Sequence, residues 1–170
     1  YTMKYLFTST IILICLFAKA QEAMALLHGT KAPPLETTNF NGDAFSLNEA
    51  LKKGPVVVVF YRGEWCSYCN RHMSALEESI PRFEELNATV VAVTPELPRY
   101  VKKTVKKTKA SFNIISDPDH KIMDRWQVSF RLDDITYERY KSFGIKVDRA
   151  SGNQDRVLPV PATYIIGMDG

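Results

Sequence analysis

The 170-residue chain lacks the features of several protein classes. Its net charge is only +3 at pH 7, and two of its lysines lie in a first stretch of twenty residues without any acid, so the remainder carries +1. This balance gives no support for nucleic-acid binding. There is no internal repeat and no low-complexity segment. A charged fraction of 24% with 45% hydrophobic residues indicates one globular domain rather than a disordered chain.

The chain also lacks an apolar run long enough to span a membrane, which needs about 20 residues. The run at 6–17 is shorter, follows a charged start and precedes an A-x-A cleavage site at 18–20. These features predict an exported protein of the periplasm or the extracellular space, without a membrane span after leader removal. An uncleaved anchor or a buried helix is the alternative. The predicted organisation is a signal peptide over 1–20, a linker over 21–29 and a domain over 30–170.

Cysteine is scarce, with three in the chain. Cys15 would leave with the leader, so the mature protein would keep Cys66 and Cys69. A disulfide between these two closes too short a loop to restrict the unfolded chain much, which makes redox chemistry or metal binding the better use for the pair. Zinc needs four ligands, and after His72 the two other histidines are the remaining nitrogen donors. We therefore expect no metal and no cofactor, with zinc as the alternative.

Strand and helix patterns alternate along the rest of the chain. The apolar, β-branched run at 56–61 has no polar alternation, which is typical of a central strand buried on both faces of a parallel sheet. The alternation predicts an α/β fold with a central, partly parallel sheet flanked by helices. The predicted strands are 56–61, 88–94, 112–115 and 162–166. The predicted helices are 46–53, 66–86 with a kink at Pro81, 99–109, one beginning at 117–119, and 133–143.

The remaining segments are predicted as turns and loops. Residues 39–43 form the turn of a small hairpin, and 149–156 form a polar loop. The turn at Met168-Asp169-Gly170 follows the last strand directly, and no partner strand comes after it. We therefore expect the domain to be C-terminally incomplete, without a closing strand and helix.

The candidate site follows from this layout, because α/β proteins place their chemistry at the carboxyl edge of the sheet. Cys66 falls at a helix N-terminus, where unpaired N–H groups and the helix dipole favour a thiolate. Cys69 lies one turn further on, within reach of a mixed disulfide on Cys66. Arg62 would add to the thiolate stabilisation, and Glu64 would oppose it or help to move a proton. Trp65 would shield the pair and give a partner protein a flat apolar surface.

Trp65-Cys66-x-x-Cys69 after a β-rich strand is similar to the thioredoxin active site. Together with the motifs at 31–33, 60–63 and 158–164, the chain resembles the peroxiredoxin-like branch of the AhpC/TSA (redoxin) family over about residues 29–170. The resemblance implies a thioredoxin-like fold that is truncated before its last strand and helix. It also implies an antioxidant oxidoreductase with a redox-active disulfide.

The resemblance contains a conflict over which cysteine reacts first. In the P-x-x-x-T-x-x-C motif of peroxiredoxins, the peroxidatic cysteine corresponds to Cys69, but the Pro position holds Arg62 and the Thr position holds Cys66. The position of the family's distant arginine holds Pro161. In thioredoxins a cis-proline at this place faces the dithiol, and the residue before it, here Val160, offers backbone hydrogen bonds to a peptide.

The leading hypothesis is an exported thiol–disulfide oxidoreductase in which Cys66 attacks and Cys69 releases the product. Its partners would be protein or small-molecule disulfides and thiols, with an unidentified thiol as electron donor. The first alternative is a thiol peroxidase that reduces hydroperoxides through Cys69, with Cys66 resolving the sulfenic acid. The second alternative is a non-catalytic binding module with a thioredoxin fold.

Overall fold

The computed structural model of the protein describes residues 26–170. The predicted signal peptide lies outside the described residues, as does most of the predicted linker. Within the described range, no helix is long and apolar enough to cross a membrane.

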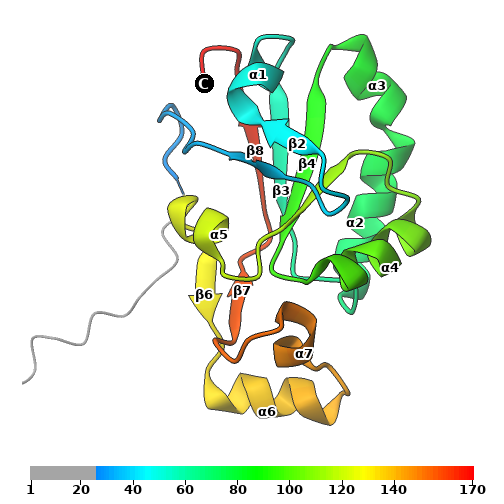
Figure 1. The fold of residues 1–170 in the computed structure, drawn as a ribbon, viewed down its shortest axis with the longest axis vertical. Helices are drawn as coiled ribbons and strands as arrows, with labels where there is room; N and C mark the ends of the chain where they lie inside the picture. The colour runs from blue at the N-terminus through cyan, green and yellow to red at the C-terminus, as the bar shows by residue number, and fades with distance from the viewer. Residues whose placement is uncertain (1–25) are drawn as a thin grey trace, which may run out of the picture.

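A four-stranded mixed sheet with the strand order β5-β4-β3-β8 forms the centre (Figure 1). The central strand β3 (Val56–Phe60) pairs in parallel with β4 (Thr89–Thr94), and β4 pairs in parallel with β5 (Asn113–Ser116). The edge strand β8 (Ala162–Ile166) runs antiparallel to β3. The predicted α/β fold with a mixed sheet is confirmed, and all four predicted strands are present.

The sheet is buried on both faces because its central strand is apolar throughout. Val58 points to one face, where it packs in a cluster with Trp126, and Val59 points to the other, where it packs with Met73. Helices α2 (Ser67–Glu78), α3 (Ile80–Glu85) and α4 (Pro98–Thr108) cover the second face. The first face is covered by α1 (Leu47–Leu51), α5 (Lys121–Arg125) and the hairpin of β1 (Glu36–Thr38) and β2 (Ala44–Ser46).

The helix after the dithiol is divided rather than kinked. The sequence predicts one helix over 66–86, whereas α2 ends at Glu78 and α3 begins at Ile80. Pro81 lies in the first turn of α3. Proline has no N–H to continue the helical ladder and is tolerated at a helix start, so the chain ends one helix and begins the next.

A second, smaller substructure lies below the sheet in Figure 1 and consists of β6 (Ser129–Arg131), α6 (Asp134–Ser142), α7 (Val147–Ser151) and β7 (Val157–Pro159). We call it the 129–159 segment. The predicted helix 133–143 is confirmed as α6. The loop prediction for 149–156 is wrong at its start, because Val147 and Ala150 are buried and form one side of α7. The short strands β6 and β7, which pair with each other, were not predicted.

Candidate active site

The two cysteines lie where the chain leaves β3 and enters α2, as predicted. Cys66 is the N-cap residue of α2, and its Sγ accepts a hydrogen bond from the Cys69 N–H at 3.2 Å. The two residues form a disulfide with a Cα–Cα distance of 5.2 Å. Cys69 is buried, with 7% of its surface exposed, whereas Cys66 is partly exposed. The accessible sulfur is therefore also the one that the helix N-terminus favours as a thiolate.

The turn before Cys66 requires a glycine. Gly63 has φ = +148° and is buried. A Cβ at this position would lie 2.5 Å from the carboxyl carbon of Glu96 and 2.9 Å from Nε1 of Trp65. The Gly63 carbonyl accepts a hydrogen bond from the Cys66 N–H at 3.1 Å, so the position of this turn sets the position of Cys66.

Glu96 is a site residue that the sequence reading missed. It follows β4 and is 1% exposed, and its Oε2 accepts a hydrogen bond from the Glu64 N–H at 2.8 Å. Burial raises the pKa of Glu96 to about 7, although the Glu64 N–H opposes the shift. An acid directly after a buried strand was the available signal, because such a residue lies at the same sheet edge as the dithiol.

Tyr61 lies on the same face of the sheet as Cys69, in one apolar cluster with it. Burial raises the pKa of the Tyr61 phenol, and the nearby Glu96 adds to the shift. The phenol is therefore neutral at physiological pH.

Trp65 and Arg62 point toward the 129–159 segment. The Trp65 ring packs edge-on against Tyr140 with 5.4 Å between centroids, in a cluster that includes Leu158. Nη1 of Arg62 donates to the Tyr140 hydroxyl at 3.3 Å, and its guanidinium lies 5.7 Å from the centre of the Phe130 ring. The Trp65 ring therefore anchors the 129–159 segment to the dithiol loop, and the expected contact of this residue with a partner protein stays a prediction.

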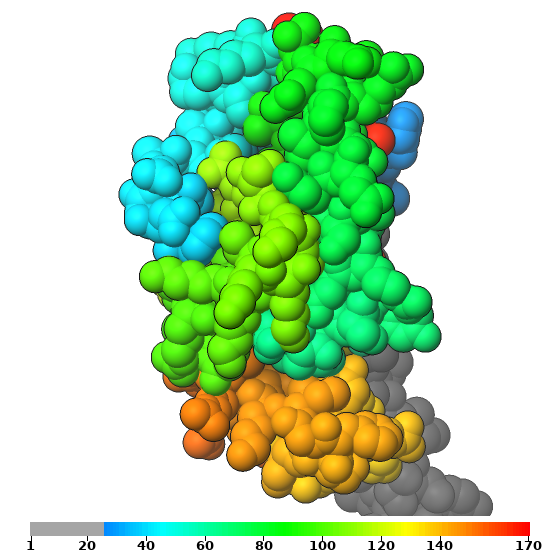
Figure 2. All heavy atoms as spheres, turned by 90° about the vertical axis from the view of Figure 1, so that its right-hand side faces the viewer, coloured from blue at the N-terminus to red at the C-terminus, as the bar shows by residue number. Residues whose placement is uncertain are grey.

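Glu64 faces α4 rather than the cysteines. Its carboxylate forms an ion pair with Lys107 at 2.5 Å. Figure 2 shows this side of the molecule, where α4 lies beside α2 and the orange part of the 129–159 segment lies below them. The exposed lysines of α4 include Lys102, Lys103, Lys106 and Lys107.

The roles that the resemblance implies for Val160 and Pro161 are corrected by the structure. The Val160 N–H donates to the Val128 carbonyl at 2.7 Å and is therefore not available to a peptide. No peptide bond among residues 26–170 is cis, so Pro161 does not take the form expected from thioredoxins. The physical reason is that this chain pairs β7 with β6, and the Val160 bond extends that pairing toward β8.

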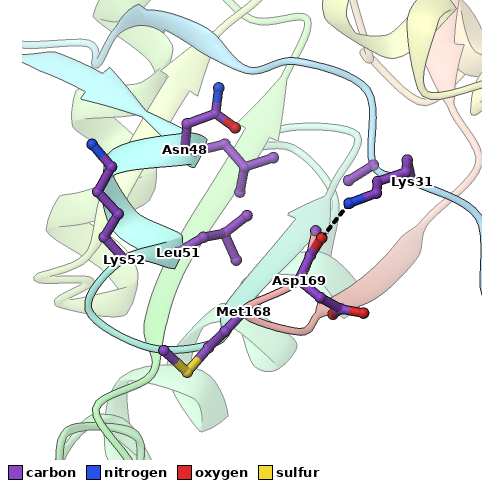
Figure 3. A pocket seen from close by; sticks show the side chains of 9 residues that line it. Lys31, Asn48, Leu51, Lys52, Met168 and Asp169 are labelled. Atoms are coloured by element: carbon purple, nitrogen blue, oxygen red, sulfur yellow. Dashed lines mark hydrogen bonds between the residues drawn. The ribbon is translucent and has the colours of Figure 1, made fainter.

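The described part of the chain holds no group of three or more His, Cys, Asp and Glu side chains placed to bind a metal ion. A pocket of about 330 Å³ lies far from the dithiol, at the opposite end of the sheet (Figure 3). Leu51 and Met168 line it, and Nζ of Lys31 donates to the Asp169 carbonyl beside it at 2.5 Å. No cysteine or histidine lines it, and the candidate dithiol site lies at the other end of the sheet.

Comparison with known proteins identifies a family and several relatives. The model of the AhpC/TSA family matches residues 28–170. Peroxiredoxin Q of Sedum lineare is 30% identical over 100 residues, covering 59% of this chain and 53% of that protein. Thiol-disulfide oxidoreductase ResA of Bacillus cereus is 28% identical over 101 residues, covering 59% and 57%. The chain spans about half the length of the curated relatives it matches.

Solved structures show the same fold. The crystal structure of peroxidoxin BcpB from Mycobacterium tuberculosis has a TM-score of 0.65 at 19% identity and covers 83% of this chain and 79% of that one. The thioredoxin domain of a thiol-disulfide oxidoreductase from Bacteroides vulgatus has a TM-score of 0.53 at 23% identity, covering 60% and 74%. The predicted thioredoxin-like fold is confirmed.

Proposed function

Because the chain belongs to the AhpC/TSA family, we propose that it is a thiol–disulfide oxidoreductase that uses Cys66 and Cys69. The observation that carries this proposal is the asymmetry of the pair. Cys66 caps α2 and is accessible, whereas Cys69 is buried directly behind it. A partner can reach one sulfur, and the second is held in place to complete the reaction.

The proposed reaction balances as two exchanges. The Cys66 thiolate attacks one sulfur of a substrate disulfide, forms a mixed disulfide and releases the first substrate thiol. Cys69, as a thiolate, then attacks the Cys66 sulfur, which releases the second thiol and closes the Cys66–Cys69 disulfide. The substrate is reduced by two electrons and the dithiol is oxidised by two. An external thiol donor then reduces the pair again.

Trapping of mixed disulfides tests the order of attack. In the Cys69→Ser variant, Cys66 has no resolving partner, so mixed disulfides with the substrate should accumulate and appear in non-reducing mass spectrometry. The Cys66→Ser variant is the matched control and should trap little. Trapping by Cys66→Ser alone would contradict the proposal and place the first attack at Cys69.

A thiol peroxidase is the second candidate, favoured by relatives named peroxiredoxin Q and by the position of Cys69 in the peroxiredoxin motif. Arg62, Cys66 and Pro161 occupy the positions of the family's peroxide-activating groups. Arg62 contacts Tyr140, which leaves its charge directed away from the buried Cys69. Stopped-flow oxidation by hydrogen peroxide separates the two functions, since a rate no greater than that of free cysteine rules out the peroxidase.

Export is part of the proposal and is supported by the leader-like sequence of residues 1–20. Expression of the full chain in a secreting host, followed by N-terminal sequencing, tests it. We expect the mature protein to begin at Gln21. A protein retained in the cytoplasm with an intact N-terminus would contradict export without affecting the proposed chemistry.

A further inference from the structure

A buried acceptor and a buried donor converge beneath the turn that carries Cys66. Glu96 Oε1 and Trp65 Nε1 lie 2.5 Å and 2.9 Å, respectively, from the same point, the position that a Cβ on Gly63 would occupy. Both atoms are buried, and neither has a hydrogen-bond partner. Each such orphan costs about 1–3 kcal/mol. One is an acceptor and the other a donor, so the two unpaired groups are complementary.

We propose that Glu96 is a positioning residue for the dithiol. Its carboxyl group accepts the Glu64 N–H and lies beside the unpaired Trp65 indole N–H, and the turn of residues 63–65 that it supports places Cys66. The inference rests on the proposed function, and it adds that Glu96 influences the position and the titration of Cys66 in the same site. Glu96 touches the turn rather than either sulfur, and it therefore acts through Gly63 and Trp65.

The charges around Glu96 come from three elements. Glu64 belongs to the turn, Tyr61 follows β3, and Lys103 and Lys107 project from α4. Burial raises the pKa of Glu96, the Glu64 charge adds to the shift, and the two lysines oppose it. The carboxyl group consequently changes its charge in the neutral range, close to where an activated thiol also titrates.

The charge of Glu96 affects the dithiol in two ways. An ionised carboxylate keeps the Glu64 N–H and has a second oxygen free to accept the Trp65 indole N–H, whereas the protonated group loses one acceptor oxygen. The negative charge also disfavours a thiolate on Cys66, because like charges in a poorly solvated site repel. A thiolate on Cys66 should therefore raise the Glu96 pKa, and the two titrations are coupled.

The coupling predicts an altered proton balance in reduction of the disulfide. Dithiothreitol supplies two electrons and two protons to the Cys66–Cys69 pair and becomes its own cyclic disulfide. If Glu96 binds its proton differently in the two redox states, this equilibrium consumes or releases a fraction of a further proton near pH 7. The equilibrium constant then depends on pH near pH 7. Dithiothreitol and a dithiol without such a neighbour would not produce this dependence.

The equilibrium with dithiothreitol is the test. The full chain is equilibrated between pH 5.5 and pH 8, and the reduced fraction is measured by alkylation and mass spectrometry. We expect an inflection near pH 7 in the wild type and its loss in Glu96→Gln, with a change of about tenfold in the equilibrium constant, equivalent to one pKa unit. Glu49→Gln, an exposed glutamate of α1, is the control and should keep the inflection.

A second measurement covers the case in which Glu96→Gln does not fold. The rate of Cys66 alkylation in the reduced wild type should show two inflections with pH, the lower one due to Glu96. Trp65→Phe removes a donor to the ionised carboxylate and should move this lower inflection to higher pH. A lower inflection that Trp65→Phe does not move, or an inflection attributed to Glu96 that persists in a folded Glu96→Gln variant, overturns the inference. A pair that dithiothreitol cannot reduce reversibly overturns the proposed function instead.

Discussion

The two ends of β3 differ in how well their buried groups are satisfied. At the amino end, Gly54 packs against the backbone of Asn87, and the Thr89 N–H donates to the Pro55 carbonyl at 2.9 Å. At the carboxyl end, within the described residues, buried polar atoms without a partner gather around the dithiol. They include Arg62 Nε, Trp65 Nε1, Asn70 Oδ1 and Glu96 Oε1.

The difference shows that the carboxyl end of β3 keeps unpaired buried polar groups, which lower the stability of the fold. Buried polar groups are normally hydrogen-bonded, and sequences depart from such rules at functional sites. The backbone at the amino end is paired and closely packed, which makes this end a structural support. The carboxyl end combines the accessible Cys66 with the ionisable Glu96. We therefore expect changes of pH and of redox state to alter this end of β3 rather than the amino end.

The largest expected effect is a loss of stability with rising pH that depends on Glu96. Its pKa is about 7 in the folded chain and 4.5 ordinarily, so the folded state binds the proton more tightly. This contribution is fully present below pH 4.5 and is lost as the pH rises through 7, amounting to about 3 kcal/mol. Urea unfolding at pH 5 and pH 8 should show a decline that Glu96→Gln reduces. An unchanged decline in the variant would contradict the assignment.

Gly54→Ala should damage the amino end alone. Its Cβ would lie 2.0 Å from the Asn87 carbonyl oxygen, a backbone atom that cannot move aside without shifting the chain. We expect a loss of about 2–3 kcal/mol in the free energy of unfolding, typical of overpacking. The dithiothreitol equilibrium of the protein that remains folded should match the wild type. A shift in that equilibrium would show that the two ends are coupled.

Tyr140→Phe tests the attachment of the 129–159 segment. The variant keeps the ring that packs on Trp65 and removes the hydroxyl that accepts from Arg62. We expect a loss of about 1 kcal/mol, the usual net value of such a hydrogen bond. Hydrogen exchange should become faster in α6 while β3 and β4 keep their protection. Equal acceleration throughout would mean that the segment and the sheet unfold as one unit.

Lys107→Gln should have the smallest effect. The ion pair of Lys107 with Glu64 is about half exposed on the lysine side, and such pairs contribute about 0–1 kcal/mol. The melting temperature should therefore change little, and less at high salt than at low salt. A loss larger than that of Tyr140→Phe would show that this pair, rather than Glu96, holds the turn.

The order of the main elements was predictable because each carries a local signal. The unbroken apolar run of β3 is one such signal, and Cys66 at the start of a helix is another. Glu96 could not be assigned from its own neighbours in sequence, since its role depends on Gly63, which lies on a different strand connection. The strands β6 and β7 were missed because three-residue strands leave no periodicity, and their pairing joins distant segments.

The contacts of Trp65 were also not predictable from its neighbours in sequence. Its place beside the cysteines suggested a surface for partners, but the direction of the ring depends on Tyr140 and Leu158, which fold back from far along the chain. The thioredoxin-derived expectations for Val160 and Pro161 failed for a similar reason. Their backbone geometry depends on β6, a pairing partner that the motif itself does not contain.

The edge strand β8 has a consequence for handling the protein. Among the described strands, it pairs with β3 alone, and its Ile165 side chain is 77% exposed. A strand edge that carries an apolar side chain can pair with a further strand, from the same protein or from a second molecule. For a protein of these 170 residues, Ile165→Lys should reduce any association that grows with concentration, which size-exclusion chromatography at several protein concentrations would measure.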